Sequence, residues 1–196
     1  MDHTTFRRPA TMADLIALPD NVKGEILDGV LYTQPRPRAW HASIGTCIAH
    51  DVHGLFHRGR GGPGGWWIIA EPGIHLPRAV EVSPDVAGWR RTRMPSFPGQ
   101  RETFRMAPDW VCEVLSPSNR NYDLKVKRRF YAEIGVEHLW YVDPPARTLT
   151  VSRLHEGRWL ELAVHGDDDR VRAEPFDAVE IDLTEWWPEV EADGSA

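Results

Sequence analysis

The chain has 196 residues, of which 41% are hydrophobic and 27% are charged, and its formal net charge is −6. This length is sufficient for one α/β domain with a hydrophobic core, and the composition is that of a globular chain. No apolar run approaches the roughly 18 residues of a membrane span, and the N-terminus lacks the apolar stretch of a signal peptide, so we expect a cytoplasmic protein that does not engage a membrane.

The charged residues are unevenly distributed along the chain. Residues 161–196 hold 12 acidic and 2 basic side chains, which leaves 17 acidic and 21 basic ones in residues 1–160. The body is therefore mildly basic, which suits a polyanionic substrate, although most surface charge only contacts solvent. We expect one domain over residues 1–196 with an acidic C-terminal segment from about residue 165.

Cys47 and Cys112 lie in apolar patterns and predict buried free thiols.

The N-terminal half predicts a hairpin between two helices. Asp28-Gly29, between two runs of β-favouring residues, is a strong hairpin signal. Apolar residues at three- and four-residue steps predict a long amphipathic helix further along. The predicted elements in chain order are a helix over 11–18, the hairpin over 24–32, the long helix over 39–57 and a glycine-rich loop over 59–65.

The second half predicts the centre of a sheet. Residues 110–115 read WVCEVL, a nearly continuous apolar run that is expected of a central strand covered on both faces. Residues 90–105, with several Arg, Pro and Gly, predict a loop. The other predicted elements are strands over 66–70, 74–76, 85–89 and 138–142, a helix over 123–134, a hairpin over 148–164 that turns at Glu156-Gly157, and a short strand near 179–183.

Three acidic residues stand out in this pattern. Glu113 lies inside the apolar run, where an ionised carboxylate is costly to bury unless a metal ion or a cation compensates it. Asp85 stands at the entry to another predicted strand, and two acids on neighbouring strands can share one hard cation through their oxygens. Glu25 lies in the N-terminal hairpin on the same face as Leu27, which makes it a candidate third carboxylate.

Lys127 is predicted to point into the molecule. Each residue of a helix advances by about 100°. The apolar arc of the predicted helix consists of Leu124, Val126, Phe130, Tyr131 and Ile134. Lys127 falls near the middle of this arc, whereas its basic neighbours Lys125, Arg128 and Arg129 fall on the opposite side. An inward lysine needs a carboxylate nearby, and the preceding strand supplies Glu113.

These residue types suit the hydrolysis of a phosphodiester. A divalent cation polarises a phosphoryl oxygen and lowers the pKa of a bound water. A further cation near the reacting groups offsets the charge that develops. We therefore predict Asp85, Glu113 and Glu25 as ligands of Mg²⁺ or Mn²⁺. Together with Lys127, which would orient the water or help to deprotonate it, they form the predicted catalytic set.

Three segments of the sequence carry a family likeness. They are KGEILDGVL (23–31), SPDVAGW (83–89) and APDWVCEVLSPSNRNYDLKVKRRFYAEIGVEHLWYVDP (107–144), of which the last is specific. With them the chain resembles the Uma2 family, formerly an uncharacterised-domain family, over about residues 11–162. That family belongs to the PD-(D/E)XK, or restriction-endonuclease-like, superfamily. The resemblance implies a mixed α/β fold in which helices flank a mixed central β-sheet.

The resemblance also implies a metal-dependent nuclease-like site. Each of the three acids corresponds to an acid of the family. Glu25 corresponds to the N-terminal acid of the family, Asp85 to the Pro-Asp acid and Glu113 to the acid of the D/E-x-K element. The position two residues after Glu113 holds Leu115, where the superfamily has lysine. The resemblance implies that Lys127, on the next helix, takes the place of that lysine.

The leading hypothesis is a Mg²⁺- or Mn²⁺-dependent DNA endonuclease. One alternative is a catalytically silent nucleic-acid-binding or assembly protein that keeps the fold, and another is a phosphoesterase that acts on RNA or small phosphates. A homodimer is a further expectation, because cutting both strands of a duplex is easier with two sites. Trp140 and Trp159 are the candidate apolar surface for it.

Simpler interpretations stand beside these. Lys127 could be only a structural partner of Glu113, and Glu25 only a solvated acid of an edge hairpin. Asp123 is expected to cap its helix and Asp109 to shape the loop before the strand. The histidines of the long helix are expected to face solvent: His50, His53 and His57. The loop arginines either grip phosphates or solvate the loop: Arg90, Arg91, Arg93, Arg101 and Arg105.

Overall fold

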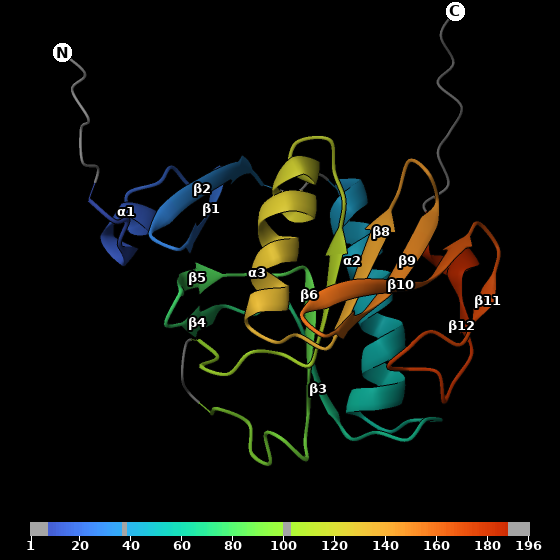
Figure 1. Ribbon diagram of the computed structural model, residues 1–196. Coiled ribbons are helices and arrows are strands. Elements are labelled where there is room, and N and C mark those ends of the chain that lie inside the picture. Colours follow the sequence, from blue (N-terminus) through green and yellow to red (C-terminus); the bar gives the residue numbers. More distant parts are fainter. Residues whose placement is uncertain (1–7, 37–38, 100–102, 188–196) are drawn as a thin grey trace, which may run out of the picture.

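The centre of the fold is a mixed sheet, shown in Figure 1 for a computed structural model that describes residues 8–36, 39–99 and 103–187. In spatial order its six strands are β10 (Arg158–Gly166), β9 (Thr148–His155), β8 (His138–Asp143), β7 (Trp110–Val114), β6 (Val86–Arg90) and β3 (Trp66–Ala70). Neighbouring strands are antiparallel except β7 and β8, which run parallel. The predicted mixed central sheet is confirmed.

A second sheet lies beside the first one. Its strands in spatial order are β2 (Val30–Pro35), β1 (Val22–Leu27), β5 (Ala79–Val82) and β4 (Ile74–Leu76). The predicted hairpin is confirmed, with Asp28 and Gly29 at positive φ angles of 50° and 76° in its turn. β5 was not predicted, because it has only four residues and is defined by pairing with β1, a strand far away in the sequence.

Helices cover both faces of the central sheet. α2 (Ala39–Val52) continues into the π-helix η1 (His53–His57), and the π-helix η2 (Tyr122–Lys127) continues into α3 (Arg128–Glu133). Figure 1 shows α3 in front of the sheet and α2 behind it. The two long predicted helices are confirmed, each with one π-helical part. Among the residues that the structure describes, no helix is long and apolar enough to cross a membrane.

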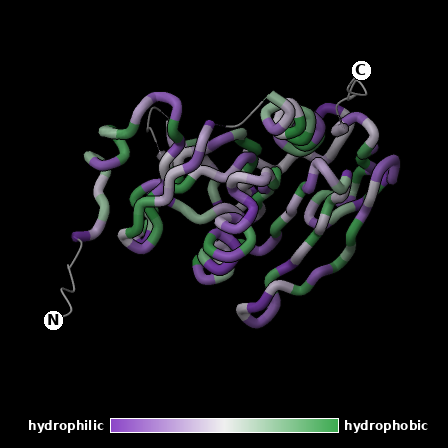
Figure 2. The backbone as a smooth tube through the Cα atoms, turned by 90° about the horizontal axis from the view of Figure 1, so that it is seen from above, coloured by the Kyte–Doolittle hydropathy of each residue, from purple (hydrophilic) through white to green (hydrophobic). Residues whose placement is uncertain are grey.

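Two hydrophobic cores lie on the two faces of the sheet. Ile44 and Ile48 of α2 pack against one face together with Trp140, whereas Phe130 and Tyr131 of α3 pack against the other. Hydrophobic and hydrophilic residues are interleaved along the backbone tube in Figure 2 instead of forming separate blocks. The elements are therefore amphipathic, as the periodicities of the sequence predict.

The remaining elements are short. They are α1 (Met12–Ile16), the paired strands β11 (Arg170–Val171) and β12 (Ile181–Asp182), and the 3₁₀ helix η3 (Leu183–Trp186). α1 ends two residues before the predicted end, and the predicted strand near 179–183 is reduced to β12. The acidic C-terminal segment is not a surface tail in its described part, because Phe176 and Trp186 are buried in the core behind the sheet.

Two side-chain predictions need correction. Cys112 is buried, as predicted, but Cys47 is only half-buried. His50 is exposed, as predicted, whereas His57 is half-buried, with its Nδ1 atom 3.1 Å from the backbone nitrogen of Ile68. His57 therefore has a structural contact with β3, which lies next to η1 and could not be located from helical periodicity alone.

Candidate functional site

The predicted site residues meet at one edge of the central sheet, where β6 begins and β7 ends. β6 and β7 are antiparallel, with Val86 opposite Cys112. Asp85 directly precedes β6, and its Oδ2 atom accepts a hydrogen bond of 2.7 Å from the backbone N–H of Val114. Glu113 is the neighbour of Val114 on β7. The strand pairing therefore places Asp85 beside the segment that carries Glu113.

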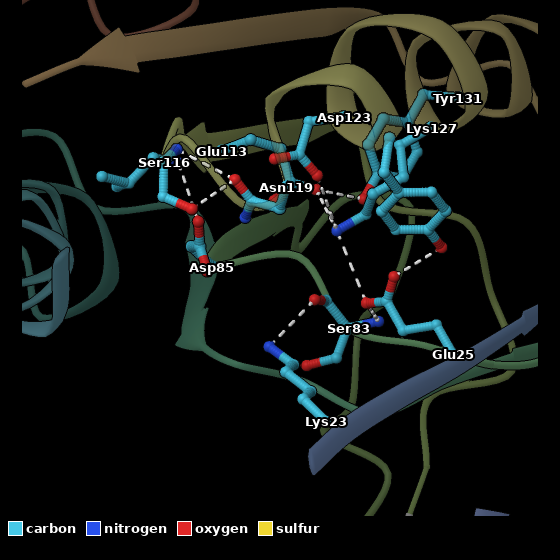
Figure 3. Close-up of polar contacts among 12 residues, drawn as sticks. Lys23, Glu25, Ser83, Asp85, Glu113, Ser116, Asn119, Asp123, Lys127 and Tyr131 are labelled. Carbon is cyan, nitrogen blue, oxygen red and sulfur yellow. Dashed lines mark hydrogen bonds and ion pairs between the residues drawn. The ribbon is translucent and has the colours of Figure 1, made fainter. Parts of the chain in front are cut away.

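Lys127 is the buried centre of the cluster (Figure 3). Its Nζ atom lies 2.7 Å from Glu113 Oε1 and 3.4 Å from Glu25 Oε1, and its side chain is 2% exposed. Burial by itself lowers the pKa of Lys127, but the charges of Glu113 and Glu25 outweigh burial and raise that pKa well above its usual value. The inward direction predicted for Lys127 is confirmed, and its ammonium group stays charged.

Glu113 is held by two donors. Its Oε1 atom accepts a hydrogen bond of 2.5 Å from Tyr131 Oη in addition to the contact with Lys127. Burial raises the pKa of Glu113, the charge of Lys127 opposes this rise, and the charge of Asp85 adds to it. Its other oxygen, Oε2, makes no hydrogen bond or ion pair to any residue within the described ranges.

Glu25 is a buried acid with both oxygens engaged. Its Oε1 atom accepts a hydrogen bond of 2.8 Å from the backbone N–H of Ser83, and its Oε2 atom accepts one of 2.6 Å from Tyr122 Oη. Only 1% of the residue is exposed, so the interpretation as a solvated hairpin acid is wrong. The cluster therefore reaches across both sheets, because Glu25 belongs to β1.

The predicted set of three carboxylate ligands is not assembled. Within residues 8–36, 39–99 and 103–187, no group of three or more His, Cys, Asp or Glu side chains is placed to hold a metal ion. The physical reason is that the ammonium group of Lys127 lies between Glu25 and Glu113. Glu25 therefore contacts Lys127 in this structure, and its role as a metal ligand stays a prediction.

Two carboxylates remain that fit a hard cation. Asp85 binds the backbone through Oδ2 and Glu113 binds Lys127 through Oε1. The second oxygen of each has no partner in the part of the chain that the structure describes. Mg²⁺ is commonly held by one or two carboxylates, with waters and substrate phosphates as its other ligands. Asp85 and Glu113 match this donor set, and Mn²⁺ accepts the same oxygen ligands.

Asp123 belongs to the cluster, and its prediction as a helix cap is wrong. It lies inside the first turn of η2, is fully buried, and approaches Lys127 Nζ to 3.8 Å. Neither of its carboxylate oxygens finds a hydrogen-bond partner among the described residues. Burial raises the pKa of Asp123. The four-residue spacing to Lys127, which places both on one helical face, was the available signal.

His41 is a site residue that the sequence reasoning missed. Its Nε2 atom lies 3.2 Å from Asp85 Oδ2. Burial lowers the pKa of His41, but the nearby carboxylate of Asp85 outweighs burial and raises it. In return, burial raises the pKa of Asp85, and His41 with the nearby lysines lowers it below the usual value. The missed signal was spacing, since His41 continues the inward stripe of Ile44 and Ile48.

Two cavities give access to this edge of the sheet. They have volumes of about 360 Å³ and about 500 Å³, and four residues line both: Lys23, Arg36, His41 and Asp85. Glu113 and Lys127 line neither cavity. Of the three predicted acids, Asp85 is therefore the one that a ligand reaches first, and the Glu113–Lys127 pair forms the layer beneath it.

The loop arginines lie at the other end of β6, away from this edge. Arg93 Nη1 is 2.7 Å from Asp109 Oδ1, and the guanidinium group of Arg91 stacks 3.9 Å from the ring centre of Trp67. Asp109 also accepts the backbone N–H of Arg90. Asp109 shapes the loop, as predicted, and these arginines have structural partners. Arg101 lies outside the described residues.

Comparisons with known proteins agree with this fold. The sequence model of the Uma2 family, described as "Putative restriction endonuclease", matches residues 12–184. Among solved structures, one similar chain is a DUF820 protein from Anabaena variabilis ATCC 29413 described as a "putative nuclease". It superimposes with a TM-score of 0.71 at 20% sequence identity, over 91% of this chain and 98% of that chain. No curated protein matches the sequence.

Proposed function

Because the chain belongs to the Uma2 family, we propose that it is a nuclease, specifically a Mg²⁺- or Mn²⁺-dependent DNA endonuclease. The observation that carries this proposal is the position of Asp85, between two open cavities and a buried Glu113–Lys127 pair of 2.7 Å. A carboxylate at the surface of such a charged layer has the chemistry that phosphodiester hydrolysis requires.

The roles follow from the contacts. Asp85 and Glu113 would hold the divalent cation, which would supply polarisation of a phosphoryl oxygen and a lower pKa for a water. Lys127 keeps Glu113 oriented and favours its ionised form, against the effect of burial. Because Lys127 contacts Glu113 at 2.7 Å, it acts on the reaction through this carboxylate.

Five further residues of the chain support the reaction. Glu25 and its partner Tyr122 fix the position of Lys127. His41 orients Asp85 at the cavity wall. Lys23 and Arg36 stand at the rim of both cavities, where their charges attract a phosphate backbone without reading its sequence.

Cleavage of supercoiled plasmid tests the proposal. Wild-type protein with Mg²⁺ or Mn²⁺ should produce nicked or linear DNA, and an excess of EDTA should stop the reaction. Asp85→Asn and Glu113→Gln keep the shape of each side chain but remove its charge, so both should reduce cleavage to background. Glu161→Gln, at an exposed acid of β10, is the matched control and should cleave like wild type. Equal cleavage by all four proteins would refute the assignment.

One observation favours a second candidate, the silent nucleic-acid-binding or assembly protein. Lys127 already contacts both Glu113 and Glu25, so an ion-pair network forms in the cluster without a metal ion. Titration calorimetry with Mn²⁺ separates the two candidates. Salt-dependent DNA binding without heat from Mn²⁺ and without cleavage would support the silent protein. Competition of plasmid cleavage by RNA would indicate the third alternative, an RNA phosphoesterase.

A further inference from the structure

The smaller of the two cavities has apolar walls next to a charged rim. It measures about 360 Å³, and its apolar wall consists of Trp40, Leu115 and four prolines, Pro35, Pro117, Pro144 and Pro145. Trp40 is 40% exposed, which is unusual for the largest apolar side chain. Cavities of about 300–1,000 Å³ with apolar walls and a few polar groups are typical of sites for small flat molecules.

Four uncharged polar residues line this cavity: Gln34, Ser116, Ser118 and Asn119. Asn119 Oδ1 accepts hydrogen bonds from the backbone N–H and the Oγ of Ser116, at 2.9 and 2.7 Å, so its side chain is fixed. Gln34 Oε1 is buried and accepts no hydrogen bond from the residues that the structure describes. A buried acceptor normally finds a donor, and the N–H group of a nucleobase is a suitable one.

The rim of the cavity carries two cations, Lys23 and Arg36, and leads into the larger cavity. Both residues line the two spaces together with His41 and Asp85. The larger space, of about 500 Å³, continues past Thr46, Ser83 and Glu71, whose carboxylate lies 3.3 Å from Lys23 Nζ. Trp40 and His41 belong to the first turn of α2, and the N-terminus of a helix favours a phosphate group. The order along the surface is therefore an apolar pocket, a rim with Lys23 and Arg36, and a polar channel that includes one acid.

We propose that this surface binds single-stranded DNA, with one unstacked base in the smaller cavity against Trp40. The inference rests on the proposed function and names its substrate class. The phosphate next to that base lies at the rim near Lys23 and Arg36, and the strand continues along the larger cavity. A duplex cannot fill the pocket without unstacking and unpairing a base, which costs a few kcal/mol. A single strand or a single-stranded end fills it without that cost.

Binding measurements without metal test the proposal independently of cleavage. The probes are three fluorescein-labelled DNAs in EDTA: a 12-nucleotide single strand, its duplex, and a 12-mer of abasic residues with the same phosphates. We expect the single strand to bind the wild-type protein at least about tenfold more tightly than either of the others. Trp40→Ala should weaken single-strand binding about 5- to 150-fold, the range for one base–aromatic stack, and should leave abasic binding unchanged.

Phe97→Ala is the control, because Phe97 is also an exposed aromatic residue, at 43%, but lies outside the cavity. It should bind like wild type. Equal binding by Trp40→Ala and wild type, or duplex binding as tight as single-strand binding, would overturn the inference. Trp40-dependent binding without metal-dependent cleavage would support the inference and refute the nuclease. Cleavage of duplex DNA without a preference for single strands would support the nuclease and overturn the inference.

Discussion

Lys127 is a buried cation whose stability depends on its acidic neighbours. Its contact with Glu113 at 2.7 Å is protected from solvent, and Glu25 and Asp123 complete its surroundings. Such a network need not stabilise a fold more than apolar packing would, but breaking it leaves uncompensated charges in the interior. The arrangement therefore ties the integrity of the site to the integrity of the fold.

We expect Lys127→Met to destabilise the protein by about 3–5 kcal/mol, because Glu113 and Glu25 lose their buried counter-charge. Urea unfolding at pH 7 measures the effect. Lys125→Met is the matched control, since Lys125 is an exposed lysine on the same helical segment, and its effect should stay within about 0.5 kcal/mol. Similar free energies of unfolding for the two variants would mean that the buried network has no energetic role.

The raised pKa of Glu81, on β5, makes the stability of the fold depend on pH. Burial raises the pKa of Glu81 to about 7, and the charge of Glu25 adds to this rise. A carboxyl whose folded-state pKa lies above its unfolded value stabilises the fold at low pH, and this contribution is lost as the pH rises through about 7. One oxygen of Glu81 is also buried without a described partner, so its ionised form is poorly compensated.

Glu81→Gln should therefore stabilise the protein at pH 8 and have little effect at pH 5. Denaturant unfolding of the variant and the wild type at both pH values gives the difference in free energy. Glu161→Gln, at an exposed acid, controls for the change in net charge and should show no such pH dependence. A gain for Glu81→Gln that is the same at both pH values would contradict this account.

At the scale of elements, the close packing of three strands depends on Gly88 of β6. A Cβ atom at Gly88 would lie 2.9 Å from Ile68 Cδ1 of β3 and 3.2 Å from the ring of Trp110 of β7. This is tighter than ordinary contact, and the tryptophan ring is buried and has little freedom to move. The central sheet thus keeps its large aromatic side chains by leaving one position without a side chain.

Gly88→Ala should cost about 1–3 kcal/mol, the usual effect of overpacking. Gly45→Ala on α2 is the opposite case, because no atom lies within 4 Å of the added methyl group. It should be neutral or should stabilise the helix by up to about 1 kcal/mol. Thermal unfolding of both variants checks the pair, and a stabilised Gly88→Ala protein would show that β6 can shift to accept a side chain.

At the scale of the whole molecule, the C-terminal segment completes the core behind the sheet. Trp186 is 1% exposed, packs in the same core as α2, and donates a hydrogen bond of 2.8 Å to Asp51 Oδ2. Trp186→Ala should therefore cost about 3–5 kcal/mol. Trp40→Ala, at an exposed tryptophan, should change the free energy of unfolding by no more than about 0.5 kcal/mol. Chemical unfolding of both variants compares them, and equal losses would contradict a buried role for this segment.

The homodimer stays a prediction, but the surface suggested for it needs correction. Trp140 is completely buried, and Trp159 donates a hydrogen bond to the backbone of Arg128. Trp159 belongs to the hairpin of β9 and β10. The exposed large apolar residues of this hairpin are Leu160 and Val164, both on β10, an edge strand of the central sheet. Light scattering should give twice the mass of one chain for wild type, and Val164→Lys should give one chain mass. A monomeric wild-type protein at high concentration would remove the prediction.

Local sequence patterns predict most of the elements and the inward direction of Lys127. The Asp28-Gly29 turn, the apolar run around Glu113 and the apolar arc around Lys127 are local patterns, in which a period of two or 3.6 residues fixes which side chains face inward. The resemblance to the Uma2 family located the predicted acids. Each of these signals needs only residues that are close in sequence.

Which of these residues touch follows from the packing of distant elements. This packing brought Glu25 onto Lys127, placed His41 beside Asp85, buried Asp123, and packed Trp186 behind the sheet. These contacts join elements that are far apart in sequence, and no local periodicity encodes the distance between two such elements. Burial then set the pKa shifts of the acids, because the cost of a charge depends on every element packed around it.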